Sequence, residues 1–326
     1  MAPLAPLVFF GTPEFALPTL EALVAAGRQP ERVVTQPPRP AGRGGRPQDP
    51  AVAAWARPRG LTVVQPERVR QPEFLRELRA LAPRVAVVAA FGQIFPRELL
   101  DLPGAGCINL HASLLPRYRG AAPIQAAIAA GETRTGVTTM LMEEGLDTGP
   151  ILLQEETPIG ARETAGELSR RLAVAGGRLV IETLDRLEQG ILAPRPQDPS
   201  LASYAPRLTR ASGKVDWNAS AGENANRIRA YTPWPGATAE LRGAPVKLLG
   251  GEALAAEAAS GSLPDGSAAP AGSFLGLHDS LAAVACGAGG SRGVLGISRL
   301  QRPGRKPQSA RDFVNGERLR TGEVFS

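Results

Sequence analysis

Short apolar runs alternate with amphipathic segments along the first part of the chain. The run Leu7–Phe10 is followed by Thr12 and Pro13, which suit the start of a helix, and by apolar residues at helical spacing as far as Gly27. Since the apolar runs have few polar positions on either face, they favour a parallel sheet covered by helices. The pattern predicts an α/β domain with a Rossmann-like, mostly parallel sheet. Its further strands are expected at residues 32–35, 61–64, 85–90, 107–111 and 137–141.

The pattern changes after a long amphipathic segment at residues 164–188, which predicts one helix. Residues 190–208 are rich in proline and have no sustained periodicity, as is typical of a linker. Beyond them, short strand candidates are separated by glycine-rich turns, at residues 245–249, 281–285 and 293–297. We therefore predict an α/β domain over residues 1–189, a linker over 190–208 and a smaller β-barrel (OB-like) domain over 209–326.

The length of the chain is consistent with two domains, and its net positive charge is consistent with an anionic partner. The chain has 326 residues, enough for two domains of about 150 residues each. It carries 37 Lys and Arg against 31 Asp and Glu, and its isoelectric point is near 10.0, so nucleic acid is a plausible partner. Only three of the 37 cationic residues are lysines, a bias that genome composition explains at least as readily as phosphate recognition.

The cysteines, histidines and N-terminal residues exclude several classes of protein. Cys107 and Cys286 are far apart among small and apolar residues, so they indicate neither a disulfide framework nor a redox motif. With two cysteines and two scattered histidines, we expect no metal site. The apolar run near the N-terminus lacks a preceding basic region and stops at Gly11, too short for a signal peptide or membrane span. We expect a cytoplasmic protein that does not bind membranes.

Three polar residues stand where an α/β sheet usually binds its ligand, at the carboxyl ends of strands. Asn109 and His111 lie two apart in a predicted strand, so both side chains are on one face. Asp147 lies between glycines in the segment Gly145–Pro150. A lone histidine at a strand end is usually structural, but an amide, an imidazole and a carboxylate together suit acyl transfer. They supply an oxyanion donor, a proton carrier and a charge that orients it.

Other catalytic motifs are absent. The chain has no Gly-x-Ser-x-Gly motif, so direct attack by the acceptor on the acyl carbon is the simpler mechanism. The segment Phe10–Pro13 does not complete Gly-x-Gly-x-x-Gly, and Gly42–Arg46 lacks the Gly-Lys-Ser/Thr of a P-loop. A dinucleotide oxidoreductase therefore ranks last among the enzyme classes considered.

Nine segments are distinctive: Phe10–Phe15, Thr35–Gly44, Asn109–Pro116, Arg119–Gln125, Gly145–Gly149, Asp216–Trp217, Ile228–Pro235, Pro245–Lys247 and Leu300–Lys306. Together they resemble the methionyl-tRNA formyltransferases, over nearly the whole chain. The Asn109–Pro116 segment is similar to that of other folate-dependent formyltransferases, so by itself it indicates only the chemistry. The arginine-rich loop after Thr35 and the second domain are the features that favour tRNA as the formyl acceptor within this resemblance. One departure is Pro38, where the family has an aspartate, which makes this loop more basic.

The resemblance implies transfer of the formyl group of 10-formyltetrahydrofolate to the α-amino group of methionyl-initiator tRNA. Residues 1–189 would form the formyltransferase catalytic domain and 209–326 a tRNA-binding domain. Asn109 would donate to the oxyanion, and His111 would either donate to the same oxygen or handle the amine proton. Asp147 would orient His111 and accept the amine proton. Folate contacts are expected from Phe91, Gly92, Gln93, Ile94, Ser113, Leu114, Leu115 and Pro116. Contacts with tRNA are expected from Arg39, Arg43, Arg46, Lys214, Arg302, Arg305 and Lys306.

Two alternatives remain at this stage. The first is a folate-dependent formyltransferase with a small amine acceptor, such as an amino sugar nucleotide or glycinamide ribonucleotide, which would not need a second domain for RNA. The second is a catalytically inactive tRNA-binding relative, against which the presence of Asn109, His111 and Asp147 argues. We expect the chain to act as a monomer.

Overall fold

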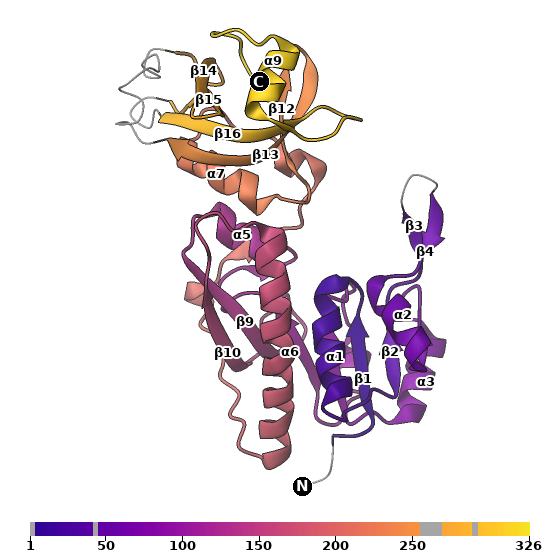
Figure 1. Cartoon of the computed structure of the whole chain (residues 1–326). Helices are drawn as coiled ribbons and strands as arrows, with labels where there is room; N and C mark the ends of the chain where they lie inside the picture. Colours follow the sequence, from indigo (N-terminus) through magenta and orange to yellow (C-terminus); the bar gives the residue numbers. More distant parts are fainter. Residues whose placement is uncertain (1–3, 42–44, 255–268, 289–292) are drawn as a thin grey trace. The chain divides into compact units, whose positions relative to one another are not determined.

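The computed structural model describes residues 4–41, 45–254, 269–288 and 293–326 (Figure 1). The chain forms two compact units. Unit 1 comprises Met1–Pro123, Arg134–Pro158 and Ser169–Ala205, and unit 2 comprises Ile124–Thr133, Ile159–Leu168 and Pro206–Ser326. No helix among the described residues is long and apolar enough to cross a membrane.

Unit 1 is built on a seven-stranded sheet with the order β10-β9-β7-β6-β1-β2-β5. The five strands from β7 to β5 are parallel, while β9 runs antiparallel to β7 and β10 antiparallel to β9. The predicted α/β domain with a mostly parallel sheet is therefore confirmed. The strands are β1 (Leu7–Gly11), β2 (Arg32–Val34), β5 (Val63–Val64), β6 (Val85–Ala89), β7 (Cys107–His111), β9 (Arg134–Leu141) and β10 (Ile151–Pro158).

Helices cover both faces of this sheet. Helix α6 packs on β7 and beside α1 (Figure 1), where Gly176 lies against the side chain of Leu110 and Gly177 against the carbonyl of Pro18. A side chain at either glycine would prevent this approach. On the other face, Phe10 makes edge contacts with Phe91 and Phe95 inside the core. The helices are η1 (Glu14–Ala16), α1 (Leu17–Ala25), α2 (Ala51–Ala56), η2 (Arg57–Arg59), α3 (Pro72–Leu81), α4 (Arg97–Leu100) and α6 (Ala165–Gln189).

Two short strand pairs extend unit 1. The arginine-rich loop predicted after Thr35 is a hairpin of β3 (Arg39–Ala41) and β4 (Arg46–Gln48). A parallel pair joins β8 (Arg119–Gly120) to β11 (Tyr204–Ala205), which comes from the segment predicted as a linker. The chain from the end of α6 to Ala205, including η3 (Pro199–Leu201), thus belongs to unit 1.

Unit 2 contains an antiparallel sheet with the order β12-β13-β16-β15-β14, as expected for a separate β domain. Near the C-terminus, Phe325 bridges to Leu241 of β12 and Val324 to Ser273 beside β14, so this tail connects the two edges of the sheet in a barrel-like arrangement. The elements of unit 2 are α5 (Pro123–Ala129), η4 (Arg210–Gly213), α7 (Ala221–Ala230), β12 (Ala237–Leu241), β13 (Ala244–Leu254), β14 (Phe274–His278), β15 (Leu281–Cys286), β16 (Gly293–Gln301), β17 (Gln308–Ser309) and α9 (Ala310–Glu317).

Candidate active site

Strand β7 presents Asn109 and His111 on the face of the sheet opposite α6. Leu110, between them, faces α6, so strand alternation directs its two neighbours the other way. The Asn109 side chain is partly exposed. Within the described part of the chain its amide makes no hydrogen bond, which leaves its N–H groups available to a ligand.

The imidazole of His111 is buried and held by a backbone carbonyl. Its Nε2 lies 2.9 Å from the carbonyl oxygen of Tyr118, and the side chain is only 6% exposed. A carbonyl can only accept a hydrogen bond, so Nε2 carries the proton. In the neutral ring Nδ1 then has a lone pair, which faces Asp147 Oδ2 across 3.6 Å. Nδ1 and Oδ2 are both acceptors, so the space between them is suited to receive one proton.

The carboxylate of Asp147 is placed by a tight loop between β9 and β10. Asp147 adopts a left-handed backbone conformation, with φ of 54°. Its Oδ2 accepts a hydrogen bond from the backbone N–H of Gly120 at 2.8 Å, and its side chain is 16% exposed. Position 149 requires a glycine, because a β-carbon there would overlap the carbonyl oxygen of Leu141. The loop thus directs a carboxylate, fixed by one backbone donor, at the imidazole.

Gln197 and Arg119 form a second layer around this pair, and Gln197 carried no signal in the sequence. Gln197, from the predicted linker, donates hydrogen bonds from Nε2 to the carbonyl oxygens of Asp147 at 2.8 Å and Gly149 at 2.7 Å. Its Oε1 accepts hydrogen bonds from Nε and Nη2 of Arg119, a side chain that is almost fully buried. Of the two residues, only Arg119 lies in a segment that the resemblance had marked, Arg119–Gln125.

The residues predicted to contact folate lie in two loops at the carboxyl ends of β6 and β7. Phe91 and Phe95 are buried, whereas the side chain of Ile94 is 92% exposed. The amide of Gln93 is engaged within the fold, where it accepts a hydrogen bond from Val69 N–H. In the second loop, the hydroxyl of Ser113 donates to the Arg117 carbonyl at 2.6 Å, and the following residues Leu114, Leu115 and Pro116 lead to Arg117.

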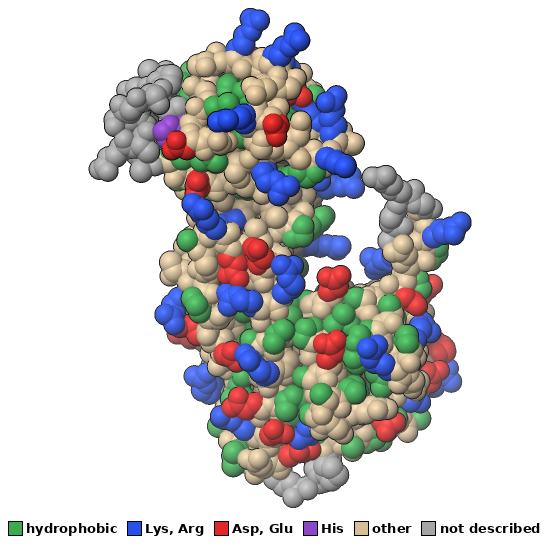
Figure 2. Space-filling model, in the orientation of Figure 1, with side chains coloured by type: hydrophobic (Ala, Val, Ile, Leu, Met, Phe, Trp, Pro, Cys, Tyr) green, Lys and Arg blue, Asp and Glu red, His purple; other side chains and the backbone are tan. Residues whose placement is uncertain are grey.

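The residues predicted to contact tRNA differ in their exposure to solvent. Arg39, Arg46, Lys214, Arg305 and Lys306 are exposed, while Arg43 lies outside the described residues. In Figure 2, Lys and Arg side chains project from both units, and acidic side chains lie among them mostly over unit 1.

Arg302 differs from the other predicted tRNA contacts because its guanidinium has internal partners. Its side chain is 12% exposed, and Nη2 pairs with Glu317 at 2.8 Å. Nη1 donates to the carbonyl of Ala244 at 2.9 Å. Arg302 therefore holds β13 and α9 together in unit 2, which leaves little of it for a phosphate.

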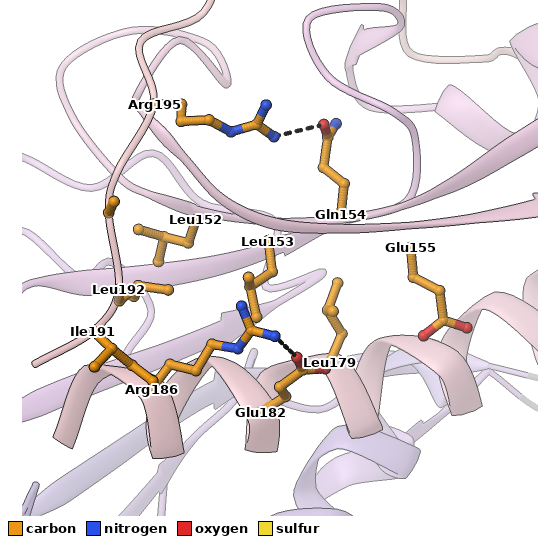
Figure 3. A pocket seen from close by; sticks show the side chains of 11 residues that line it. Leu152, Leu153, Gln154, Glu155, Leu179, Glu182, Arg186, Ile191, Leu192 and Arg195 are labelled. Atoms are coloured by element: carbon orange, nitrogen blue, oxygen red, sulfur yellow. Dashed lines mark hydrogen bonds and ion pairs between the residues drawn. The ribbon is translucent and has the colours of Figure 1, made fainter. Parts of the chain in front are cut away.

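A separate cavity of about 520 Å³ lies elsewhere on unit 1 (Figure 3). It is formed by β10, the second half of α6 and residues 191–195, and Asn109, His111 and Asp147 do not line it. Arg186 and Glu182 form an ion pair along one side, and Arg195 contacts Gln154 on the other.

Comparisons with known proteins identify the family to which the chain belongs. Residues 6–184 match the model of the formyl transferase family, and residues 207–318 match the formyl transferase C-terminal domain. The chain therefore belongs to the formyl transferase family.

Full-length relatives narrow the assignment within this family. The chain is 47% identical over 319 residues to the methionyl-tRNA formyltransferase of Citrifermentans bemidjiense, covering 98% of this chain and 96% of that protein. It is 49% identical over 323 residues to the methionyl-tRNA formyltransferase of a Synechococcus species, covering 98% of both. At this identity and coverage, the chain groups with the methionyl-tRNA formyltransferases.

Solved structures share the fold at lower identity. HypX from Aquifex aeolicus, in complex with tetrahydrofolic acid, matches with a TM-score of 0.59 and 17% identity over 95% of this chain, which spans 46% of HypX. An N-formyltransferase from Helicobacter canadensis, in complex with folinic acid and dTDP-3-aminofucose, has a TM-score of 0.62 and 18% identity over 90% of this chain and 98% of that one.

Proposed function

We propose that Asn109, His111 and Asp147 transfer the formyl group of 10-formyltetrahydrofolate to the α-amino group of methionyl-initiator tRNA. The observation that carries this proposal is the pair of acceptor atoms, His111 Nδ1 and Asp147 Oδ2, which face each other at 3.6 Å. Membership of the formyl transferase family supports formyl transfer as the reaction. The similarity to methionyl-tRNA formyltransferases supports methionyl-tRNA as the acceptor.

The acceptor must lose protons during the reaction. An α-amino group has a pKa of about 7.7 to 8.0, so most of it is protonated at neutral pH. The amine attacks the formyl carbon once it is neutral, and the new C–N bond gives a tetrahedral intermediate. The proton released from its nitrogen enters the space between His111 and Asp147. The C–N10 bond then breaks, and N10 of tetrahydrofolate takes up a proton as it leaves.

Charge develops on the formyl oxygen in the intermediate. The amide N–H groups of Asn109, which have no partner in the described structure, are suited to donate to that oxygen. Because such donors act mainly in the transition state, removing this one should lower the rate about 10²- to 10³-fold.

The substrates would occupy different surfaces. We assign the folate to the loops at residues 91–95 and 113–116, where the exposed Ile94 offers an apolar side chain near the exposed backbone of Gly92. We assign tRNA phosphates to Arg39, Arg43 and Arg46 in unit 1 and to Lys214, Arg305 and Lys306 in unit 2. The internal ion pair of Arg302 supports a structural role for that residue rather than phosphate binding.

This proposal divides the chain into a catalytic domain over residues 1–189, a connection over 190–208 and a tRNA-binding domain over 209–326. The two family models, which match residues 6–184 and 207–318, support this division. We further propose that the chain acts as a monomer in the cytoplasm. Sedimentation equilibrium at micromolar concentration would give the mass of one chain, and a dimer mass would contradict the monomer.

One experiment tests the proposed function directly. Purified protein is incubated with 10-formyltetrahydrofolate and either methionyl-initiator tRNA, methionyl-elongator tRNA or small amino sugar nucleotides, and formyl incorporation is measured. We expect the initiator tRNA to be labelled preferentially. Its affinity for the protein should fall steeply as the salt concentration rises, because several phosphate contacts are involved. Labelling of a small amine alone would reassign the acceptor, and no labelling by a protein that still binds the tRNA would favour the inactive relative.

A further inference from the structure

The segment 197–205, which follows α6 and leads into unit 2, contacts both the chain after β7, where the Tyr118 carbonyl holds His111, and the loop that carries Asp147. We call it the positioning segment. Its residues lie 50 or more positions from Asp147 and 78 or more from the loop after β7 in sequence. Six of its hydrogen bonds, made by Gln197 and Ser203, meet the backbone or side chains around His111 and Asp147.

On the His111 side, the positioning segment fixes the carbonyl that binds the imidazole. The hydroxyl of Ser203 accepts a hydrogen bond from the N–H of Tyr118 at 2.9 Å, and the Ser203 carbonyl accepts one from the N–H of Arg119 at 2.8 Å. Tyr118 has a left-handed backbone with φ of 59°. Since such a conformation is unfavourable for a bulky residue, these neighbouring bonds help to hold the Tyr118 carbonyl where His111 Nε2 can donate to it.

On the Asp147 side, Gln197 holds the backbone of the loop itself. Its Nε2 donates to the carbonyls of Asp147 and Gly149, so both ends of this short stretch are fixed by one amide. Its Oε1 accepts from Arg119, whose chain neighbour Gly120 donates to the Asp147 carboxylate. An amide fits this place because one side chain must donate to two carbonyls and accept from a guanidinium.

We propose that Gln197 is a positioning residue for formyl transfer, which holds the Asp147 loop so that Oδ2 faces His111. This inference rests on the proposed function, since it requires Asp147 to take part in the reaction. Gln197 touches neither substrate in this assignment and acts through Asp147. Its loss should therefore lower kcat, while the KM for 10-formyltetrahydrofolate stays within about two-fold, because displacement of a reacting group by about 1 Å can cost on the order of 10²-fold in rate.

Gln197→Glu is the main test variant. A glutamate keeps the size of the side chain and a partner for Arg119, but its ionised carboxylate cannot donate to the carbonyls of Asp147 and Gly149. Gln197→Leu removes all the polar contacts and serves as the second variant if the first alters folding. Gln189→Leu, at an exposed position at the end of α6, is the matched control. Melting temperatures identify variants that remain folded.

Single-turnover rates are then measured in a double-mutant cycle with Asp147→Asn. We expect Gln197→Glu to slow transfer on the order of 10²-fold in the native background, but less than two-fold when Asp147→Asn is already present, since both changes remove one effect. Unchanged rates for the folded Gln197 variant, a change in KM alone, or the same loss in both backgrounds would each overturn the positioning role. Full activity of Asp147→Asn would instead overturn the proposed mechanism, so the two failures are distinguishable.

Discussion

The Nε2 atom of His111 lies 2.9 Å from the carbonyl oxygen of Tyr118, which determines the tautomer of the imidazole. We predict that the neutral ring carries its proton on Nε2, with Nδ1 free. Two-bond ¹H–¹⁵N NMR spectra of the histidine side chains distinguish the tautomers. The chain has only two histidines, so a His278→Gln variant assigns the signals. A proton found on Nδ1 of the neutral ring would contradict this geometry.

Replacing Asp147 with asparagine should preserve the fold and remove most activity. The asparagine oxygen can still accept the hydrogen bond from Gly120 N–H, but the side chain can no longer take up a proton. We expect kcat to fall about 10²- to 10⁴-fold, as for the loss of a general base. Steady-state formylation measures the rate and circular dichroism checks the fold. Turnover within a few-fold of the unmodified protein would remove Asp147 from the reaction.

Gly120 should not tolerate a side chain, because β8 and β11 approach closely there. Its φ is 118°, and a β-carbon would lie 2.6 Å from the carbonyl oxygen of Ala205. We predict that Gly120→Ala lowers the free energy of unfolding by about 1–3 kcal/mol and impairs catalysis, since the Gly120 N–H would move away from Asp147.

Gly243 provides the control for Gly120. It also has a positive φ, 72°, but a β-carbon there meets no atom within 4 Å. Gly243→Ala should therefore cost only about 1 kcal/mol and leave kcat unchanged. Calorimetric melting and formylation assays of both variants test the comparison, and equal effects on kcat would show that close packing at Gly120 is unimportant.

The Arg302–Glu317 pair should make unit 2 sensitive to acid. Hydrogen bonding to Arg302 lowers the pKa of Glu317 below its ordinary value. The pair therefore stabilises the fold fully above the unfolded-state pKa of about 4.3 and loses this contribution as the pH falls through the lower folded-state value. Glu317→Gln should cost about 1–3 kcal/mol at pH 7 and progressively less below pH 4.

Urea unfolding at several pH values measures this effect. Glu156→Gln is the control, because Glu156 pairs with Arg134 through side chains that are 47% and 64% exposed. Such an exposed pair should contribute less than about 1 kcal/mol. A cost for Glu317→Gln that is the same at pH 3 and pH 7 would show that the ion pair does not stabilise unit 2.

Both cysteines should be unreactive in the folded protein. Burial raises the pKa of the Cys107 thiol to about 12, and burial likewise raises the pKa of Cys286 to about 12. Since the thiolate is the reacting species, a disulfide reagent at pH 8 should modify neither residue in the native protein and both after unfolding in guanidinium. Rapid modification of the native protein would indicate that one of the two cores opens readily.

Elements with a strong local pattern were predictable from the sequence, and edge elements were not. The apolar runs of β1, β6 and β7 gave the parallel part of the sheet, and the leucines of α6 gave that helix. Strand β10 was missed because it forms the edge of the sheet, where the polar run Gln154–Glu156 hides the strand pattern. The hairpin of β3 and β4 was also missed, since proline and glycine dominate its sequence.

The site was predictable only as far as its residues lie in recognisable motifs. Asn109 and His111 stand out by their spacing in a strand, and Asp147 by its flanking glycines. Gln197 lies in a proline-rich stretch without periodicity, and its partners Arg119 and Asp147 are 78 and 50 positions away. Local spacing carries no information on such contacts, so only the folded chain reveals them.

The pairing of β8 with β11 also affects where the two domains of such a chain can be recombined with those of a relative. The two family models leave residues 185–206 between them, yet Gln197, Ser203 and Ala205 lie in that interval. A hybrid joined directly at the boundaries of the family models would combine two recognisable modules and lack the residues that hydrogen-bond to the backbone around His111 and Asp147. On the proposed mechanism, we expect a recombinant that keeps formyl transfer to inherit this interval with the first module, with its crossover point after Ala205.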